Sequence, residues 1–326
     1  MSVKSSVLQM LEANRGNSVS GQQLANELGV SRSAVWKAIK ALETDGYAIE
    51  AVTNKGYLLA SSNDLISAEG INNYLAAQYK KLPITALKTV SSTNTHARMM
   101  AANGAKHGTI VVSEEQTNGK GRMGRTFFSP EGSGIYMSII LRPNTHTTNA
   151  VFITTAAAVA VCRAIAKLTV AKPTIKWVND IILRDKKICG ILTEAVTDFE
   201  NGMVESVVVG IGINFKEPDI ALPDELKKIV GFIFNEKTAP ISRNQMIAEI
   251  ANELISICEN LSDRTFIEEY RQLSMVLGEN IQFSRNNEWH FGKALNIDDE
   301  GALIVLLPDG NTVRLNSGEI SLRRVR

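Results

Sequence analysis

The sequence has few cysteines, and no two of them are close together. Only three occur in 326 residues, Cys162, Cys189 and Cys258, and each lies among apolar neighbours. A chain without a C-x-x-C pair indicates neither a zinc site nor a disulfide framework. We therefore expect each cysteine to be a small, buried apolar side chain.

The sequence also lacks an excess of charge of one sign. It contains 35 Lys and Arg residues against 34 Asp and Glu residues, which gives a formal net charge of +1. This balance excludes a bulk polycation that would bind nucleic acid through its overall charge. Any contact with nucleic acid must therefore come from a local basic surface.

No segment reads as a signal peptide or a membrane span. The N-terminus has no basic stretch followed by an apolar one, so we expect no secretion and a cytoplasmic protein. The most apolar run, residues 150–170, contains Thr154, Thr155, Arg163 and Lys167. These residues favour a buried core helix over a membrane helix, and no membrane partner is expected.

The length and the 44% apolar content predict a multidomain α+β protein with two or three domains. We place the domains at residues 1–62, 65–273 and 274–326. The linker between the first two is expected at the polar stretch 61–64.

Residues 1–62 read as a winged helix-turn-helix. Ser20 and Gln23 form a capping box, in which Ser20 caps the Gln23 amide and the Gln23 side chain reaches back. Gly29 ends that helix in a left-handed conformation, and Ser31 begins the next helix. A β-hairpin over residues 47–59 then forms the wing. Two helices joined by a short turn containing glycine are typical of helix-turn-helix proteins.

The third helix and the wing tip carry polar and basic residues that could meet DNA phosphates and base edges. The candidates are Ser31, Arg32, Ser33, Trp36, Lys37, Lys40 and Lys55. Residues 1–60 hold six basic and five acidic residues, so the charge excess is small (6 − 5 = +1). A winged helix that serves only protein contacts therefore stays open as an alternative.

The stretch 116–130 combines bendable backbone with positive charge. Gly119, Gly121 and Gly124 alternate with Lys120 and Arg122, and Arg125 follows. Glycine lets a ligand approach the backbone closely, and the cations indicate an anionic ligand.

Two common phosphate motifs do not fit this stretch. Residues 119–124 match G-x-G-x-x-G, but strand and turn residues follow where a dinucleotide fold needs a helix. The Walker pattern fails because Gly121, and not Ser or Thr, follows Lys120. A flexible loop without a ligand remains the plain alternative at this point.

Other polar residues and glycines stand at unusual places in the central domain. Ser92, Thr93 and Asn94 precede a helix at 95–102 and are either plain caps or ligand contacts. A hairpin over 175–194 has polar residues within its apolar runs, and glycines interrupt the strand at 206–214. These positions are Lys176, Asn179, Asp180, Lys187, Gly190, Gly210 and Gly212.

The last fifty or so residues alternate between short strands and turns. The Asp309-Gly310 pair is a hairpin signal, and strands are predicted at 280–283, 289–297, 302–307, 312–315 and 319–323. This pattern predicts a small SH3-like barrel.

Taken together, the motifs resemble those of the biotin–protein ligases. The resemblance rests on Ser92-Thr-Asn94, the loop 119–130, Lys176-Trp-Val-Asn-Asp180, Lys187-Ile-Cys-Gly-Ile-Leu192, Gly210-Ile-Gly-Ile-Asn214 and the terminal 318–323. With the winged helix, the whole chain is similar to the bifunctional form that is both ligase and biotin operon repressor. The resemblance implies a central mixed α/β domain of the class II synthetase-like type.

The resemblance also implies a two-step reaction. Biotin and Mg²⁺-ATP give biotinoyl-5′-AMP, and the biotinyl group then passes to a lysine of a biotin carboxyl carrier domain. When carrier is scarce, an adenylate-bound homodimer would bind biotin operator DNA. ATP and Mg²⁺ are thus the expected cofactors, with the carrier, the operator and a second copy as partners.

The roles of individual residues follow from the same resemblance. Lys187, Arg122 and Arg125 are the expected catalytic cations, and Asp180 is a metal candidate. Biotin contacts are implied for Ser92, Thr93, Asn94, Gln116, Gly119, Lys120, Arg122, Lys187, Gly190, Gly210 and Gly212. Nucleotide contacts are implied for Arg125, Phe127, Lys176, Asn179, Asn214 and Arg323.

Three residues depart from the family pattern. Lys120 and Met123 stand where arginine is common, and Val178 stands where proline is frequent. A lysine at 120 would lose the two-pronged contact of an arginine.

Two alternatives are weighed against this function. Lipoate–protein ligases share the fold, but their Arg-Arg and Gly-Gly-Gly motifs are missing here. A ligand-responsive repressor with a degenerate ligase domain is disfavoured by the intact loop and by Lys187.

Overall fold

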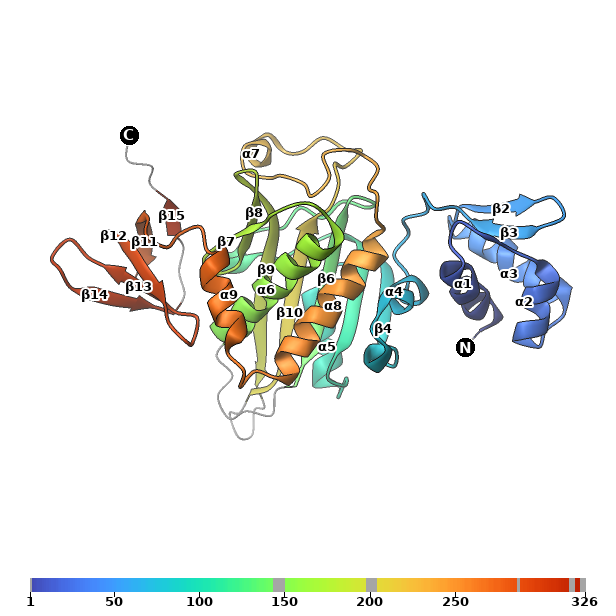
Figure 1. Ribbon diagram of the computed structural model, residues 1–326, viewed down its shortest axis with the longest axis horizontal. Coiled ribbons are helices and arrows are strands. Elements are labelled where there is room, and N and C mark those ends of the chain that lie inside the picture. Colours follow the sequence, from blue (N-terminus) through green and yellow to red (C-terminus); the bar gives the residue numbers. More distant parts are fainter. Residues whose placement is uncertain (1, 143–149, 198–203, 286–287, 317–319, 323–326) are drawn as a thin grey trace. The chain divides into compact units, whose positions relative to one another are not determined.

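The computed structural model describes residues 2–142, 150–197, 204–285, 288–316 and 320–322 (Figure 1). Its contacts divide the chain into two compact units. The first contains residues 1–81 and 238–249, and the second contains residues 82–237 and 250–326. The predicted domain limits at 62–65 and 273–274 differ from this division and stay a prediction.

The first unit holds the predicted winged helix. Its helices are α1 (Val3–Ala13), α2 (Gly21–Leu28) and α3 (Arg32–Thr44), and its strands are β1 (Ser18–Val19), β2 (Ile49–Val52) and β3 (Gly56–Leu59). The three strands form an antiparallel sheet in the order β1-β3-β2. Apolar side chains of the three helices, among them Leu11, Leu24 and Ile39, are buried together in its core.

Most of the predicted caps of this unit are present. Ser20 Oγ accepts a hydrogen bond from the Gln23 amide at 3.0 Å, and Ser31 Oγ accepts one from Ala34 N at 3.2 Å. Gly29 adopts the left-handed conformation, with φ +64°. The capping box is wrong in its second half, because the Gln23 side chain donates to Glu27 Oε1 at 2.9 Å. The Gln23 side chain thus pairs with an i,i+4 neighbour on the same helix face.

The first unit continues through α4 (Ala68–Tyr74) and the short η1 (Ala77–Tyr79), and it includes the first turns of α8 (Arg243–Glu259). The expected linker leads into a tightly bound segment, because the buried Arg243 donates from Nε to Asp64 Oδ2 at 3.0 Å. Asn244 Nδ2 donates to the Leu65 carbonyl at 2.9 Å. Helix α8 then runs on into the second unit, so one helix belongs to both.

The second unit is built on a seven-stranded sheet in the order β4-β5-β6-β10-β9-β8-β7. The strands are β4 (Ile84–Val90), β5 (Thr109–Gln116), β6 (Gly134–Leu141), β7 (Thr174–Lys176), β8 (Asp180–Leu183), β9 (Lys186–Thr197) and β10 (Val204–Asn214). The β4–β5 pair is parallel, and the other neighbours are antiparallel. The predicted turn at Asn201-Gly202 lies outside the described residues.

Helices α5 (Thr93–Ala102), α6 (Ala150–Leu168) and α9 (Thr265–Leu273) pack on the sheet or on each other, and α7 (Asp224–Lys227) is a single turn (Figure 1). Helix α6 is long and apolar enough to cross a membrane by composition alone. However, 67% of its most apolar stretch is buried inside the protein, as expected of a core helix.

A five-stranded antiparallel sheet completes the second unit, in the order β14-β13-β12-β11-β15. Its strands are β11 (Asn280–Arg285), β12 (Glu288–Ile297), β13 (Leu303–Leu306), β14 (Thr312–Leu315) and β15 (Ile320–Leu322). The predicted order of a winged helix, a mixed α/β domain and a small all-β domain is thereby confirmed.

Candidate active site

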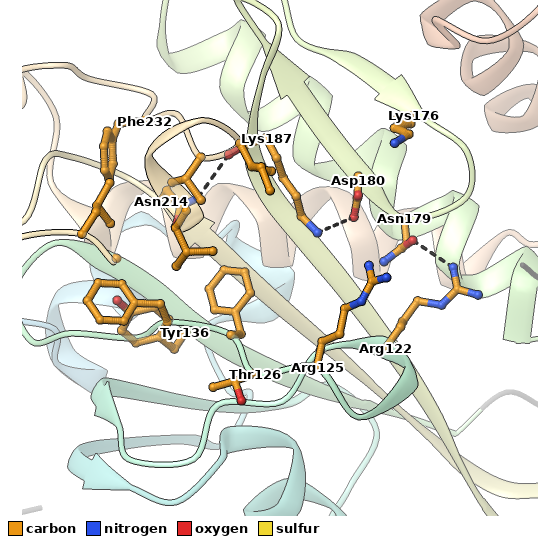
Figure 2. A pocket seen from close by; sticks show the side chains of 18 of the residues that line it. Arg122, Arg125, Thr126, Tyr136, Lys176, Asn179, Asp180, Lys187, Asn214 and Phe232 are labelled. Atoms are coloured by element: carbon orange, nitrogen blue, oxygen red, sulfur yellow. Dashed lines mark hydrogen bonds and ion pairs between the residues drawn. The ribbon is translucent and has the colours of Figure 1, made fainter. Parts of the chain in front are cut away.

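The second unit contains a cavity of about 480 Å³, a size typical of small-molecule sites. The glycine loop, the start of β6, the β7–β8–β9 hairpin and the segment 215–232 all contribute to it. Four cationic residues line it: Arg122, Arg125, Lys176 and Lys187. In Figure 2, Arg122, Arg125 and Lys187 extend toward the same part of the cavity. Such a concentration of positive charge suits a ligand with several phosphates.

The glycine loop is a closed hairpin turn. Gly121 N donates to the Arg125 carbonyl at 2.7 Å, and Phe127 N donates to the Gly119 carbonyl at 2.9 Å. At the tip, Met123 (φ 56°) and Gly124 (φ 73°) are both left-handed. This reversal brings Arg122 and Arg125, which lie on either side of the tip, to one cavity.

Arg122 is held by a residue that was itself predicted to bind nucleotide. Its Nη1 donates to Asn179 Oδ1 at 2.9 Å (Figure 2). Asn179 in turn donates from Nδ2 to the Ile191 carbonyl at 2.9 Å, and its own carbonyl accepts from Ile191 N at 3.0 Å. Asn179 therefore ties the loop to the hairpin, and its direct contact with a nucleotide stays a prediction.

Lys187 is the second residue of β9 and forms an ion pair with Asp180, with Nζ 2.7 Å from Oδ1 (Figure 2). Its backbone is held on two sides. Lys187 N donates to the Ile229 carbonyl at 2.9 Å, while its carbonyl accepts from Gly231 N at 2.9 Å and from Asn214 Nδ2 at 3.3 Å. Gly190 leaves room for the lysine, because a Cβ there would lie 3.3 Å from Lys187 Nζ. The lysine is thus positioned by backbone and carboxylate together.

Asp180 was the predicted metal ligand. Within the described ranges, no three His, Cys, Asp or Glu residues gather where they could hold a metal ion. Asp180 is the one acidic residue among those lining the large cavity. This donor set fits Mg²⁺ held chiefly by phosphate oxygens, since Mg²⁺ is commonly bound through substrate phosphates and one or two carboxylates. A contact between Asp180 and Mg²⁺ stays a prediction.

The cavity also has apolar and aromatic lining. It includes Tyr136, Leu222, Leu226, Ile229, Phe232, Trp289 and Ile320. Apolar, aromatic side chains together with cations match the two ends of a nucleotide, a flat base and a phosphate chain. The sequence analysis missed these residues, although Leu222, Leu226 and Ile229 recur at helical spacing.

Most of the predicted biotin contacts surround a second, much smaller cavity of about 30 Å³. Its lining includes Ser92, Thr93, Asn94, Gln116, Lys120, Phe127, Gly190, Gly210 and Gly212. The predicted residues are therefore brought together, yet the space between them holds little more than one water molecule.

The Phe127 ring fills the space that the glycines leave. A Cβ on Gly212 would lie 2.7 Å from this ring, and one on Gly190 would lie 3.6 Å from it. The ring also meets Tyr136 edge to face, with 6.4 Å between the ring centres. The missing side chains at 190 and 212 accommodate Phe127 in this conformation, so a bicyclic ligand could enter only if the ring moved.

Polar groups next to Phe127 are already hydrogen-bonded to each other. The Gln116 amide oxygen accepts from Thr93 N at 2.8 Å and from Thr93 Oγ1 at 3.2 Å. Gln116 Nε2 donates to Ser129 Oγ at 3.0 Å, and Ser129 Oγ donates to the Phe127 carbonyl at 2.8 Å. Gln116 thus connects the start of α5 to the glycine loop.

Comparison with known families covers all three regions of the chain. The profile of the HTH domain matches residues 3–58, and that of the biotin/lipoate A/B protein ligase family matches residues 86–214. The biotin protein ligase C-terminal domain matches residues 276–323.

One relative extends over nearly the whole chain. The bifunctional ligase/repressor BirA of Bacillus spizizenii is 36% identical over 312 residues, which are 93% of this chain and 94% of the relative. The chain belongs to the family of bifunctional biotin ligase/repressors. The BirA of Escherichia coli is 29% identical and likewise covers 93% of the chain.

Solved structures agree with this family. A biotin protein ligase from Aquifex aeolicus, in complex with biotin and ATP, is 26% identical and gives a TM-score of 0.63. The match spans 74% of this chain and 99% of the Aquifex ligase chain. The resemblance inferred from the sequence motifs is therefore confirmed.

In this bifunctional ligase/repressor, the predicted DNA-binding residues lie at the surface of the first unit. Ser31, Arg32, Ser33, Trp36, Lys37, Lys40 and Lys55 are all exposed. Trp36 is 52% exposed, which is high for so large an apolar side chain. Lys40 Nζ is paired with Glu43 Oε2 at 2.6 Å. The residues share one helix and the wing tip, as a DNA-reading surface requires.

The remaining predictions concern residues outside the cavities. Arg323, a predicted nucleotide contact, lies outside the described residues. Cys162 and Cys189 are buried, as predicted, whereas Cys258 is only partly buried. Burial raises the pKa of all three thiols, that of Cys258 to about 12.

Proposed function

We propose that this chain activates biotin with ATP, transfers it to a lysine of a biotin carboxyl carrier domain, and represses biotin genes as an adenylate-bound dimer. The observation that carries the ligase activity is the pair of adjoining cavities. One is lined by four cations and apolar side chains, and the other by the polar residues expected to contact biotin. Lys187 and Gly190, which belong to the same strand β9, line one cavity each.

In the first step the biotin carboxylate attacks the α-phosphate of ATP, and pyrophosphate leaves. Both reactants are anions, so the site must offset their repulsion and the charge that develops in the transition state. Lys187 is the main cation for this task, because its ammonium is fixed by Asp180. Arg122 and Arg125 hold the remaining phosphate oxygens. Asp180 and the phosphates would hold Mg²⁺, which would supply further neutralisation of the phosphate charge.

In the second step a neutral lysine amine of the carrier attacks the acyl carbon of biotinoyl-5′-AMP, and AMP leaves. The adenylate is a good leaving group, so positioning and exclusion of water dominate this step. The glycine loop, closed by its own hydrogen bonds, serves as the cover over the intermediate.

Repression follows from the first unit. The exposed third helix reads a half-site in the major groove, and the wing tip contacts the backbone. Two copies joined through the central domain present two such helices to a two-fold operator. A cytoplasmic location accords with both roles.

Biotin-dependent exchange of pyrophosphate into ATP tests the ligase activity. We expect exchange by the wild type and a loss of about 10²–10³-fold in Lys187→Ala, since removing one preorganised charge contact costs that much in comparable sites. Lys186→Ala is the matched control, because the Lys186 ammonium binds the Lys228 carbonyl and does not line the cavity.

Folding of each variant is checked by circular dichroism. No exchange by folded wild-type protein would contradict the proposal. Equal losses in the two lysine variants would remove Lys187 from its central role.

A further inference from the structure

A chain of buried hydrogen bonds runs beneath the small cavity, and no predicted role explains it. Asn94 Nδ2 donates to the Leu192 carbonyl at 3.1 Å and to Glu194 Oε2 at 2.8 Å. The other oxygen of Glu194 accepts from Arg98 Nη1 at 3.1 Å. Asn94 is therefore anchored through its nitrogen by a carboxylate that is itself held by an arginine.

This anchoring fixes which way the Asn94 amide faces. A flipped amide would turn its oxygen toward a carbonyl and a carboxylate, and neither of these can donate a proton. The Asn94 oxygen therefore faces the opposite side, where a Cβ on Gly210 would lie only 2.1 Å from it. The missing side chain at Gly210 thus leaves room for the amide, and Glu194 with the Leu192 carbonyl selects its orientation.

The orientation passes to the hydroxyl groups of the cavity. Ser138 Oγ, fully buried, lies 2.7 Å from Asn94 Oδ1 and 2.9 Å from Thr93 Oγ1. Thr93 Oγ1 gives its one proton to Gln116 Oε1, so it can only accept from Ser138. The single Ser138 proton is therefore directed at two acceptors, Asn94 Oδ1 and Thr93 Oγ1. Each hydroxyl thereby has a set direction.

This series of hydrogen bonds ends at the side-chain carbonyl of Gln116. Thr93 donates from N and Oγ1 to the Gln116 carbonyl oxygen, at 2.8 and 3.2 Å. This oxygen is the same kind of acceptor as the carbonyl of a urea. The donors of Thr93 therefore already suit the carbonyl oxygen of a urea-like group. In such a group, N–H donors lie beside the accepting carbonyl.

We propose that Glu194 is a positioning residue which, through Asn94 and Ser138, fixes the donor and acceptor pattern that recognises the ureido ring of biotin. The inference rests on the proposed function, since it names the ligand of that site. Glu194 touches neither cavity, and it acts by holding Asn94 in one orientation. Without it, the amide can flip and the hydroxyl directions become mixed.

The test compares binding of biotin with binding of 2-iminobiotin, in which a guanidine replaces the urea. Calorimetry with the full chain gives both affinities, and pyrophosphate exchange gives KM for biotin and for ATP. We expect Glu194→Ala to weaken biotin about tenfold, a typical loss for a hydrogen bond to a charged group. The affinity for 2-iminobiotin should change by less than about twofold, so the selectivity for biotin over 2-iminobiotin falls. The KM for ATP should stay within about twofold of the wild-type value.

Two further variants sharpen the comparison. Glu194→Gln keeps an acceptor for Asn94 and should retain biotin affinity within about threefold. Glu205→Ala breaks another partly exposed Arg–Glu ion pair, in which Arg142 Nη1 lies 2.7 Å from Glu205 Oε1. Glu205 belongs to the neighbouring strand β10. This control should leave both affinities unchanged.

Unchanged biotin affinity in Glu194→Ala would overturn the inference, as would equal losses for biotin, 2-iminobiotin and ATP. The latter is what a purely structural role would give. Wild-type protein that binds no biotin would overturn the proposed function, and the inference with it. The failure of one is therefore distinguishable from the failure of the other.

Discussion

Several residues that were predicted to contact a ligand instead contact a neighbouring residue of the same chain. Gly210 was expected to let a ligand approach the backbone, but the Asn94 amide occupies the space beside it. Asn179 was expected to touch nucleotide, but its side chain holds Arg122. The same residues can still border a bound ligand, since they line the cavities.

Sequence patterns predict which residues are polar in an apolar setting, and they did so here. They do not predict which of these residues pair, because Arg122 and Asn179 are far apart along the chain and the fold alone brings them together. Glu194 and Ser138 were missed for a similar reason. Each stands within a strand where a single polar residue is common, and only the buried contacts give it meaning.

A double-substitution experiment tests the role of Gly210. Gly210→Ala should lower the free energy of unfolding by about 1–3 kcal/mol, as overpacking of a buried site does. In an Asn94→Ala background the same change should cost much less, because the atoms that a Cβ at 210 would meet are gone. Urea denaturation of the four proteins measures the coupling. An equal cost in both backgrounds would show that Asn94 is not what Gly210 accommodates.

Among the elements, long apolar runs with clear ends were predicted closely. The apolar run at 135–141 predicts a strand, and β6 spans Gly134–Leu141. The apolar run at 150–170 predicts a core helix, and α6 spans Ala150–Leu168. Helix α4 and strand β4 were not predicted. Strand β4 has no continuous buried face and pairs only with β5, so its sequence lacks a strong period.

The backbone hydrogen bonds of the glycine loop determine a feature that its composition does not predict. Its composition predicted an anion site, whereas its backbone hydrogen bonds make it a hairpin that carries Phe127 into the small cavity. The proposed binding of biotin in that cavity therefore requires the Phe127 ring to move, and with it the loop that carries the ring.

Phe127→Ala tests this coupling. Loss of the ring opens the space beside Gly190 and Gly212, so the association rate of biotin should rise several-fold. Biotinoyl-5′-AMP should dissociate faster, because an apolar cover is removed. Stopped-flow fluorescence measures both rates. Phe128→Ala is the neighbouring control, since Phe128 lines the large cavity and not the small one. An unchanged association rate in Phe127→Ala would mean that the ring does not limit entry.

For the whole molecule, the overall composition does not indicate DNA binding. The net charge is only +1, although the outer face of helix α3 is polar and basic. The winged helix was nevertheless predictable, because its caps and turns are local signals. The contacts of Arg243 and Asn244 with the segment after the winged helix were not, because they join residues 177 to 179 positions apart.

Helix α8 contributes residues to both compact units. Its first turns hold Asp64 and Leu65 in the first unit, and its remainder belongs to the second unit. Removing the Arg243 side chain would take a buried partner from the Asp64 carboxylate.

The operator-binding prediction addresses the molecule as a whole. Binding to a duplex from the chain's own biotin promoter should require both biotin and ATP, because the proposed DNA-binding form is the adenylate-bound dimer. Fluorescence anisotropy at several salt concentrations measures the affinity and its salt slope. Each phosphate contact contributes about 0.9 to that slope, so Lys37→Ala in both protomers should lower it by about 2. Lys40→Ala should lower it less, because Lys40 is paired with Glu43. Tight binding without biotin and ATP, or equal slopes in all three proteins, would contradict this account of the repressor.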